Sequence, residues 1–157
     1  MPPLHYDRVY RLKQDFPDIE IIINGGITAI EEVRDHLESV DGVMIGREAY
    51  QNPWFLRELN DAFYDGQGSP ADRLSVIEAY MPYIQAQLDR DVYLRHMTRH
   101  MLGTFHGQGG AKGWRRYLSE NGPRKDAGLE VIEQALEYVR DKPQVKDKDA
   151  CYRFAAA

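Results

Sequence analysis

The chain has 157 residues, of which 43% are hydrophobic and 29% are charged, and its formal net charge is −5. This composition is typical of a packed globular protein with one average domain or two small ones. No apolar run approaches the roughly 20 residues that a membrane-spanning helix needs, and the N-terminal segment lacks the apolar core of a signal peptide. The single cysteine, Cys151, cannot form an internal disulfide and has no metal-ligating neighbour. We therefore expect a reducing, cytoplasmic location and no membrane association.

The first part of the chain has the pattern of alternating helices and parallel strands. A helix is expected over residues 7–15, and the β-branched run at 19–23 predicts a strand buried on both faces. Two glycines end this run, and Thr28 with Glu31 predicts a capping box that opens a second helix. A second apolar strand is expected at 42–45. This order predicts a βαβ unit with parallel strands.

After residue 65 the pattern changes to helices only. Gly66, Gly68 and Pro70 indicate a linker, and apolar residues then recur at helical spacing to about residue 140. We expect an α/β part over residues 1–65, a helical part over 66–142, and a disordered tail over 143–157.

The predicted α/β part contains too few strands to form a complete sheet. Two parallel strands leave both edges and part of both faces without cover. We therefore expect residues 1–65 to be the end of a larger α/β domain, with Met1 inside the fold and not at its beginning.

Two glycine turns are candidates for a phosphate-binding site. Asn24, Gly25 and Gly26 follow the first predicted strand, and Gly46 with Arg47 follows the second. Backbone N–H groups at a helix N-terminus attract anions, glycine permits close approach, and arginine adds a permanent positive charge. Each turn alone is more simply an ordinary connection. Together, at equivalent strand ends, the two turns favour phosphate binding, as in the loops after the last strands of an α/β barrel.

A basic region lies between residues 94 and 125. It contains a single acidic residue, Glu120, and its seven basic residues are Arg95, Arg99, Lys112, Arg115, Arg116, Arg124 and Lys125. Such an island in an acidic chain suggests a polyanionic partner, although solvated helix faces explain it equally well. Trp114 is either a ring that stacks on a base or a core residue of its helix.

No catalytic or metal-binding constellation is evident. A nucleophile elbow of the Gly-x-Ser-x-Gly type is missing from the sequence. His96 and His100 have the spacing of two metal ligands on one helix face, but the sequence offers no third ligand. We predict no metal site and no catalytic residue within this chain.

Three segments together resemble a known family. They are "PPLHYDRVYRLKQDFPDIEIIINGGI", "VDGVMIGREAYQNPWFL" and "RHMTRHMLGTFHGQGGAKGWRRYLSENG". They are similar, in this order, to the C-terminal half of tRNA-dihydrouridine synthases of the A type. The similarity extends from about residue 2 to about residue 140.

The resemblance implies a flavin enzyme that acts on tRNA. The family reduces the C5–C6 double bond of D-loop uridines, using FMN with NADPH as the electron donor. Its fold is a TIM (β/α)8 barrel followed by a helical domain that binds tRNA. The residues implied to hold the FMN phosphate are Asn24, Gly25, Gly26, Gly46 and Arg47. Those implied to contact tRNA are Lys112 and Arg115.

The resemblance also implies that the chemical centre lies elsewhere. The family's catalytic cysteine, and the Lys and His near the flavin ring, belong to the earlier half of the barrel. Cys151 does not match the catalytic position. We therefore expect the chain alone to be inactive and to associate with the missing barrel half or with itself. Two alternatives stay open: a nonenzymatic tRNA-binding helical module, and a protein interaction domain with incidental glycine turns.

Overall fold

A computed structural model of the chain describes residues 3–66, 68 and 70–142. The chain forms two compact units, Met1–Ser69 and Pro70–Ala157, whereas the sequence pattern places the boundary at residue 65. The predicted tail over 143–157, including Cys151, lies outside the described residues. Within the described part, no helix is long and apolar enough to cross a lipid bilayer.

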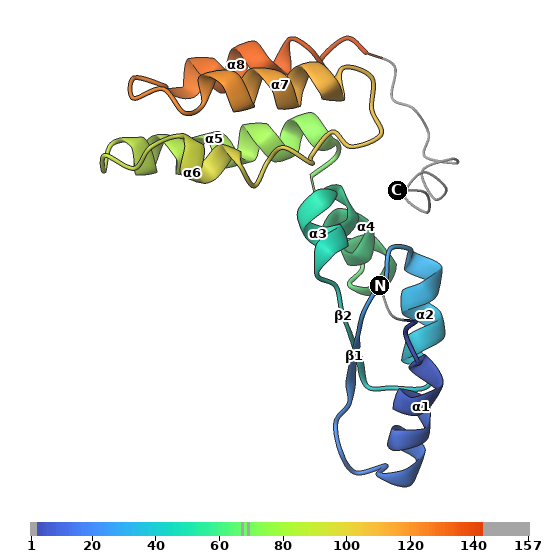
Figure 1. The fold of residues 1–157 in the computed structure, drawn as a ribbon. Coiled ribbons are helices and arrows are strands. Elements are labelled where there is room, and N and C mark those ends of the chain that lie inside the picture. Colours follow the sequence, from blue (N-terminus) through green and yellow to red (C-terminus); the bar gives the residue numbers. More distant parts are fainter. Residues whose placement is uncertain (1–2, 67, 69, 143–157) are drawn as a thin grey trace. The chain divides into compact units, whose positions relative to one another are not determined.

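The first unit combines helices with a pair of parallel strands. Its elements in chain order are α1 (Tyr6–Asp15), β1 (Ile22–Asn24), α2 (Ile30–Leu37), β2 (Gly42–Met44), α3 (Arg47–Gln51) and α4 (Trp54–Phe63). β1 pairs with β2 in parallel, and α2 connects them and runs beside the pair (Figure 1). The register places Asn24 opposite Met44. The predicted βαβ unit is confirmed.

The strand pair is buried on one face only. Ile23 is 2% exposed and belongs to a small core that also contains Ile27 and Val33. Its neighbour Ile22 is 57% exposed, and Met44 on the paired strand is 54% exposed. The prediction of burial on both faces is wrong for this chain. The reason is that α1 and α2 both contribute to the core on the Ile23 side.

The N-cap residue of α2 lies one residue after the predicted N-cap, Thr28. Ala29 is the N-cap residue, and the Glu32 carboxylate accepts hydrogen bonds from the N–H groups of Thr28 (2.7 Å) and Ala29 (3.0 Å). Glu32, and not the predicted Glu31, is therefore the third helical residue that closes the cap. The capping pattern therefore predicted that a glutamate closes the cap, but it placed the cap one residue too early.

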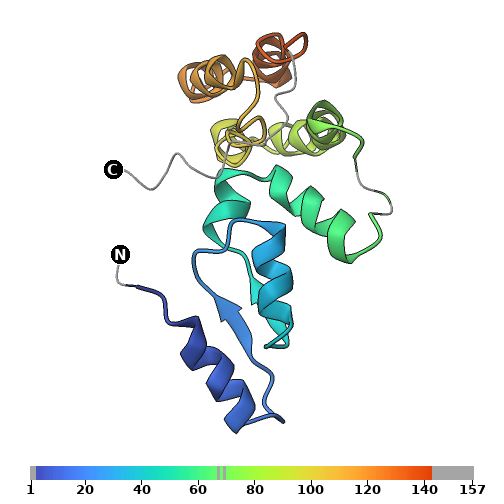
Figure 2. The same ribbon diagram turned by 90° about the vertical axis from the view of Figure 1, so that its right-hand side faces the viewer.

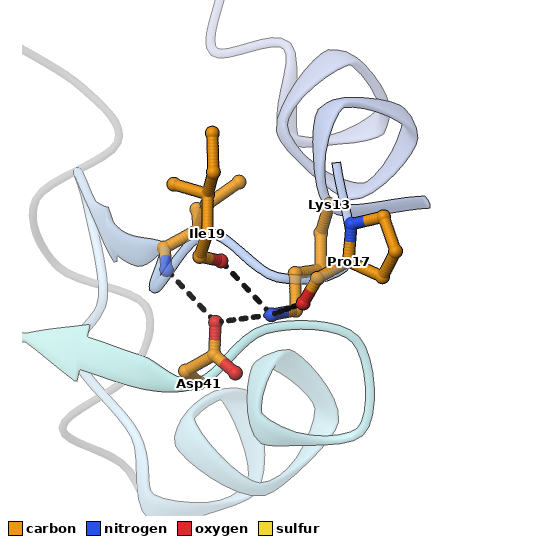
Figure 3. A network of polar contacts seen from close by, with 5 residues as sticks. Lys13, Pro17, Ile19 and Asp41 are labelled. Carbon is orange, nitrogen blue, oxygen red and sulfur yellow. Dashed lines mark hydrogen bonds and ion pairs between the residues drawn. The ribbon is translucent and has the colours of Figure 1, made fainter. Parts of the chain in front are cut away.

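An ion pair lies at the end of the strand pair that is opposite the glycine turns. The Lys13 ammonium lies 2.8 Å from the Asp41 carboxylate and donates to the carbonyls of Pro17 (2.8 Å) and Ile19 (3.0 Å) (Figure 3). The same carboxylate accepts from the Ile21 N–H at 2.8 Å. These hydrogen bonds, from Lys13 first and then from Ile21, lower the pKa of Asp41 below its ordinary value.

The lowered pKa of Asp41 predicts a pH-dependent contribution to stability. Such a contribution is complete above the unfolded-state pKa of about 3.9 and is lost as the pH falls through the lower folded-state pKa. Asp41→Asn keeps an oxygen for the Ile21 N–H but removes the charge that faces Lys13. We expect it to lower the urea midpoint of the first unit at pH 7 and to change it little at pH 2. Equal losses at both pH values would contradict the role of the charge.

The second unit contains only helices in its described residues. They are α5 (Arg73–Leu88), α6 (Arg95–Thr98), α7 (Ala111–Asn121) and α8 (Leu129–Leu136). Helices α7 and α8 lie side by side, as Figures 1 and 2 both show, and α8 also contacts α5. Their shared core is centred on fully buried side chains, among them Trp114, Ile132 and Ile84.

Candidate functional site

The first glycine turn has a backbone that requires glycine. Gly25 has φ = 133° and Gly26 has φ = 63°, so both residues lie in the region that side chains disfavour. They follow Asn24, the last residue of β1. The turn therefore re-directs the chain from the strand toward α2 in a form that larger residues do not adopt without strain.

The second turn lies at the same edge of the strand pair. Because Asn24 is paired with Met44 in parallel register, the residues that follow both strands leave the sheet at one edge. Gly46 is exposed, and among the described residues no atom lies within 4 Å of where its Cβ would be. Arg47 begins α3 and has an exposed side chain. The structure thus brings the residues of both turns to neighbouring strand ends.

Two residues that the sequence pattern did not single out support the first turn. The Tyr6 hydroxyl donates a hydrogen bond of 2.6 Å to the Gly25 carbonyl. The Leu4 side chain lies 3.3 Å from the point where a Cβ on Gly25 would be, and 3.0 Å from that of Gly26. Both residues precede or begin α1 and are distant from the turn in the sequence, so no local spacing rule identifies them.

A buried histidine lies behind Tyr6. His36 is 5% exposed, and its Nδ1 is 2.6 Å from the Tyr10 hydroxyl. The Tyr6 ring packs edge-on against the His36 ring at a centroid distance of 4.6 Å. Burial is the largest cause that raises the pKa of Tyr10, so its hydroxyl is protonated at neutral pH and can serve as a donor.

The two turns have the groups that fit a phosphate. The glycine backbone permits close approach, the space beside Gly46 is open, and the guanidinium of Arg47 can bind an anion. The predicted residues Asn24, Gly25, Gly26, Gly46 and Arg47 include no general acid, general base or nucleophile suited to pH 7. This arrangement is suited to binding and orienting an anion, and not to bond chemistry.

The second candidate site is the outer face of α7. Lys112 and Arg115 are both exposed and three residues apart, so they lie on one face of the helix. Trp114 between them is 0% exposed, packs edge-on against Phe105 at 4.9 Å, and donates through Nε1 to the Met101 carbonyl at 3.2 Å. Trp114 is therefore a core residue, and the interpretation of its ring as a base-stacking platform is wrong.

The basic region is not uniformly available to a polyanion. Arg124 lies 3.0 Å from the Asp126 carboxylate, which is just outside the basic stretch of sequence. Their hydrogen bond lowers the pKa of Asp126 and raises that of Arg124, so both stay charged and paired at neutral pH. Arg124 therefore contributes less accessible positive charge to the basic region than a residue count suggests.

A buried arginine fixes the loop that precedes α7. The guanidinium of Arg73 is 3% exposed and donates to the carbonyls of Thr104 (2.7 Å) and His106 (3.1 Å). This contact joins the start of α5 to the segment that enters α7. No sequence pattern predicts this contact, because the partners of Arg73 are backbone atoms more than 30 residues away.

The two histidines considered for metal binding do not form part of a larger ligand cluster. His96 and His100 are exposed, and the Arg99 Nε lies 3.0 Å from the His100 Nε2. Across the described ranges, no group of three His, Cys, Asp or Glu side chains is placed to hold a metal ion.

Comparison with known proteins identifies close relatives. The family model described as dihydrouridine synthase (Dus) matches residues 1–140. The chain is 51% identical over 141 residues to the tRNA-dihydrouridine(20/20a) synthase of Haemophilus ducreyi, covering 90% of this chain and 44% of that protein. It is 50% identical over 142 residues to the enzyme of the same name from Escherichia coli K12, covering 90% of this chain and 41% of that protein. The chain thus spans less than half the length of these curated relatives.

Proposed function

The chain belongs to the dihydrouridine synthase family, and on this premise we propose that it is the C-terminal part of an A-type tRNA-dihydrouridine synthase. Such an enzyme reduces D-loop uridines of tRNA to dihydrouridine with FMN and NADPH, and we propose that it acts in the cytoplasm. One observation carries the cofactor assignment for this chain. Two glycine turns, one followed by an arginine, leave a parallel strand pair at the same edge.

We propose that the first unit is the last part of a TIM barrel. In such a barrel the helices cover the outer face of the sheet, while the other face points into the barrel interior. The strand pair has this one-sided form, because Ile23 packs with the helices while Ile22 and Met44 are exposed. Further barrel strands would cover these exposed side chains and the two strand edges.

In this proposal the residues of the two turns hold the phosphate end of FMN. The glycine backbone of residues 25 and 26 allows the phosphate to approach its N–H groups, and Arg47 supplies the opposite charge. When bound, FMN supplies the hydride for the uracil ring. The family resemblance places the protonating cysteine outside residues 1–157, so this chain would anchor the cofactor without supplying the catalytic acid.

We propose that the second unit binds the tRNA backbone through α7. Lys112 and Arg115 have exposed side chains on the same helix face, and the buried Trp114 anchors that face to the core. Phosphate contacts of this kind position an RNA and make its affinity dependent on salt. The nonenzymatic tRNA-binding module, our second candidate, rests on this same face and needs no flavin.

The 157-residue chain tested alone is expected to form no dihydrouridine. The catalytic cysteine of the family has no counterpart in this sequence, so the proton that the uracil ring needs has no donor in place. The measurement is dihydrouridine formation on an unmodified tRNA transcript with added FMN and NADPH. Turnover by the purified chain would show that the chemical centre lies within these residues.

A further inference from the structure

Tyr6 links α1 to the first glycine turn through a single hydrogen bond. Its partly buried hydroxyl donates to the Gly25 carbonyl at 2.6 Å. We propose that Tyr6 is a positioning residue that sets the direction of the Gly26 N–H, and thereby prepares the turn for a phosphate group. This inference rests on the proposed FMN-binding function, and it assigns a role to a residue outside the two turns.

The geometry of the peptide bond transmits the effect. All described peptide bonds are trans, so the carbonyl of Gly25 and the N–H of Gly26 point in opposite directions. Because Tyr6 holds this carbonyl on the side of α1, the Gly26 N–H points to the other side. Within the described residues no acceptor is found for that N–H. A phosphate oxygen is the type of acceptor that such a backbone donor binds.

The peptide between Gly25 and Gly26 needs a contact from outside the turn to fix its orientation, because both residues are glycines. Gly25 (φ = 133°) and Gly26 (φ = 63°) adopt left-handed conformations, and a glycine peptide can rotate to other orientations at little steric cost. The apolar side chain of Leu4 lies where a Cβ on either glycine would be crowded, so it restricts space without fixing a direction. The Tyr6 hydroxyl supplies the directional contact.

Tyr6 packs against a buried histidine of α2. Its ring lies edge-on to the His36 ring at 4.6 Å with an interplanar angle of 69°, and His36 is held by its burial, at 5% exposure. The Tyr10 hydroxyl lies 2.6 Å from the His36 Nδ1. Tyr10 therefore offers a matched control. It is a tyrosine of the same helix, and it has a hydroxyl bonded to the same cluster, but that hydroxyl does not reach the turn.

The experiment compares Tyr6→Phe and Tyr10→Phe in the complete 157-residue chain. Tyr6→Phe keeps the ring on His36 and removes only the bond to Gly25. FMN is titrated into the millimolar range and followed by the amide NMR signal of Gly26, with the folded fraction of each variant checked from its thermal unfolding. We expect Tyr6→Phe to weaken FMN binding by about threefold to tenfold, as the loss of one directing hydrogen bond would do. We expect Tyr10→Phe to match the wild type.

A second measurement does not depend on the cofactor. Residual dipolar couplings of the Gly26 N–H, recorded without ligand, should change in Tyr6→Phe and stay unchanged in Tyr10→Phe. A purely structural role of Tyr6 would lower stability without altering this orientation. Equal FMN affinity and equal couplings in Tyr6→Phe and wild type would overturn the positioning role. Failure of the wild-type Gly26 signal to respond to FMN would instead overturn the proposed cofactor function on which the inference rests.

Discussion

Charge reversal at Lys112 and Arg115 is expected to weaken tRNA binding by about two orders of magnitude. Both side chains are exposed on one face of α7, so each can contact a phosphate, and glutamate replaces that attraction with repulsion. The slope of log affinity against log salt concentration should fall by about two, because two fewer counterions are released. The measurement is a titration of Lys112→Glu/Arg115→Glu with an unmodified tRNA transcript at several salt concentrations.

A matched control separates the effect of phosphate contacts on the α7 face from the effect of the net charge of the chain. Arg124→Glu/Arg140→Glu changes the formal charge by the same amount, but Arg124 pairs with Asp126 at 3.0 Å and Arg140 pairs with Glu137 at 2.8 Å. We expect a much smaller loss of affinity for this control. Equal losses would mean that net charge, and not the α7 face, determines binding. Absence of salt-dependent RNA affinity in the wild type would favour the third alternative, a protein interaction domain.

Flavin binding should not respond to the α7 variants, because the glycine turns belong to the other compact unit. A chain that binds tRNA through α7 and does not bind FMN at all would favour the nonenzymatic module. The two functions can therefore be tested separately in the same polypeptide.

The sequence predicted the order of elements well because that order depends on local patterns. Apolar runs that end at glycine turns located β1 and β2 with α2 between them, and the apolar helical repeats predicted that helices follow residue 65. Burial was predicted less well. The run ending at Ile23 suggested two covered faces, but cover depends on which other elements pack there, and Ile22 is 57% exposed. The apolar residues of a strand indicate that its faces can be buried, but they do not specify which elements cover those faces.

The candidate sites also divide into local features that the sequence predicts and long-range contacts that it does not. The glycine turns could be found from their spacing, since parallel strands place their carboxyl ends at one edge of a sheet. The hydrogen bond from Tyr6 to the first turn could not be predicted, because it spans 19 positions along the chain. Trp114 could be read as a core residue or as an exposed stacking ring, because both have helical spacing. The 0% exposure of Trp114 in the folded chain shows that it is a core residue.

Gly110→Ala is expected to destabilise the second unit by about 2–5 kcal/mol. Gly110 is the N-cap residue of α7 and has φ = 83°, where an alanine is strained by about 1–2 kcal/mol. A Cβ there would also overlap the carbonyl group of Tyr138, lying 2.8 Å from its carbon and 3.3 Å from the Cα of Val139. Both contacts are with backbone that follows α8, so they cannot be relieved by rotating a side chain. Overpacking of this kind costs about 1–3 kcal/mol more.

Gly107→Ala isolates the contribution of the clash. Gly107 has a similar left-handed conformation, with φ = 74°, but it is exposed in the loop before α7. We expect it to lose only the conformational part, about 1–2 kcal/mol, as measured by urea unfolding of the amide signals of the second unit. Similar losses for both variants would show that strain alone acts at Gly110. A larger loss at Gly110 would show that α7 begins where it does because a glycine lets it approach the end of α8. That approach sets the position of Lys112, two residues later, and makes the proposed RNA-binding face dependent on a residue outside it.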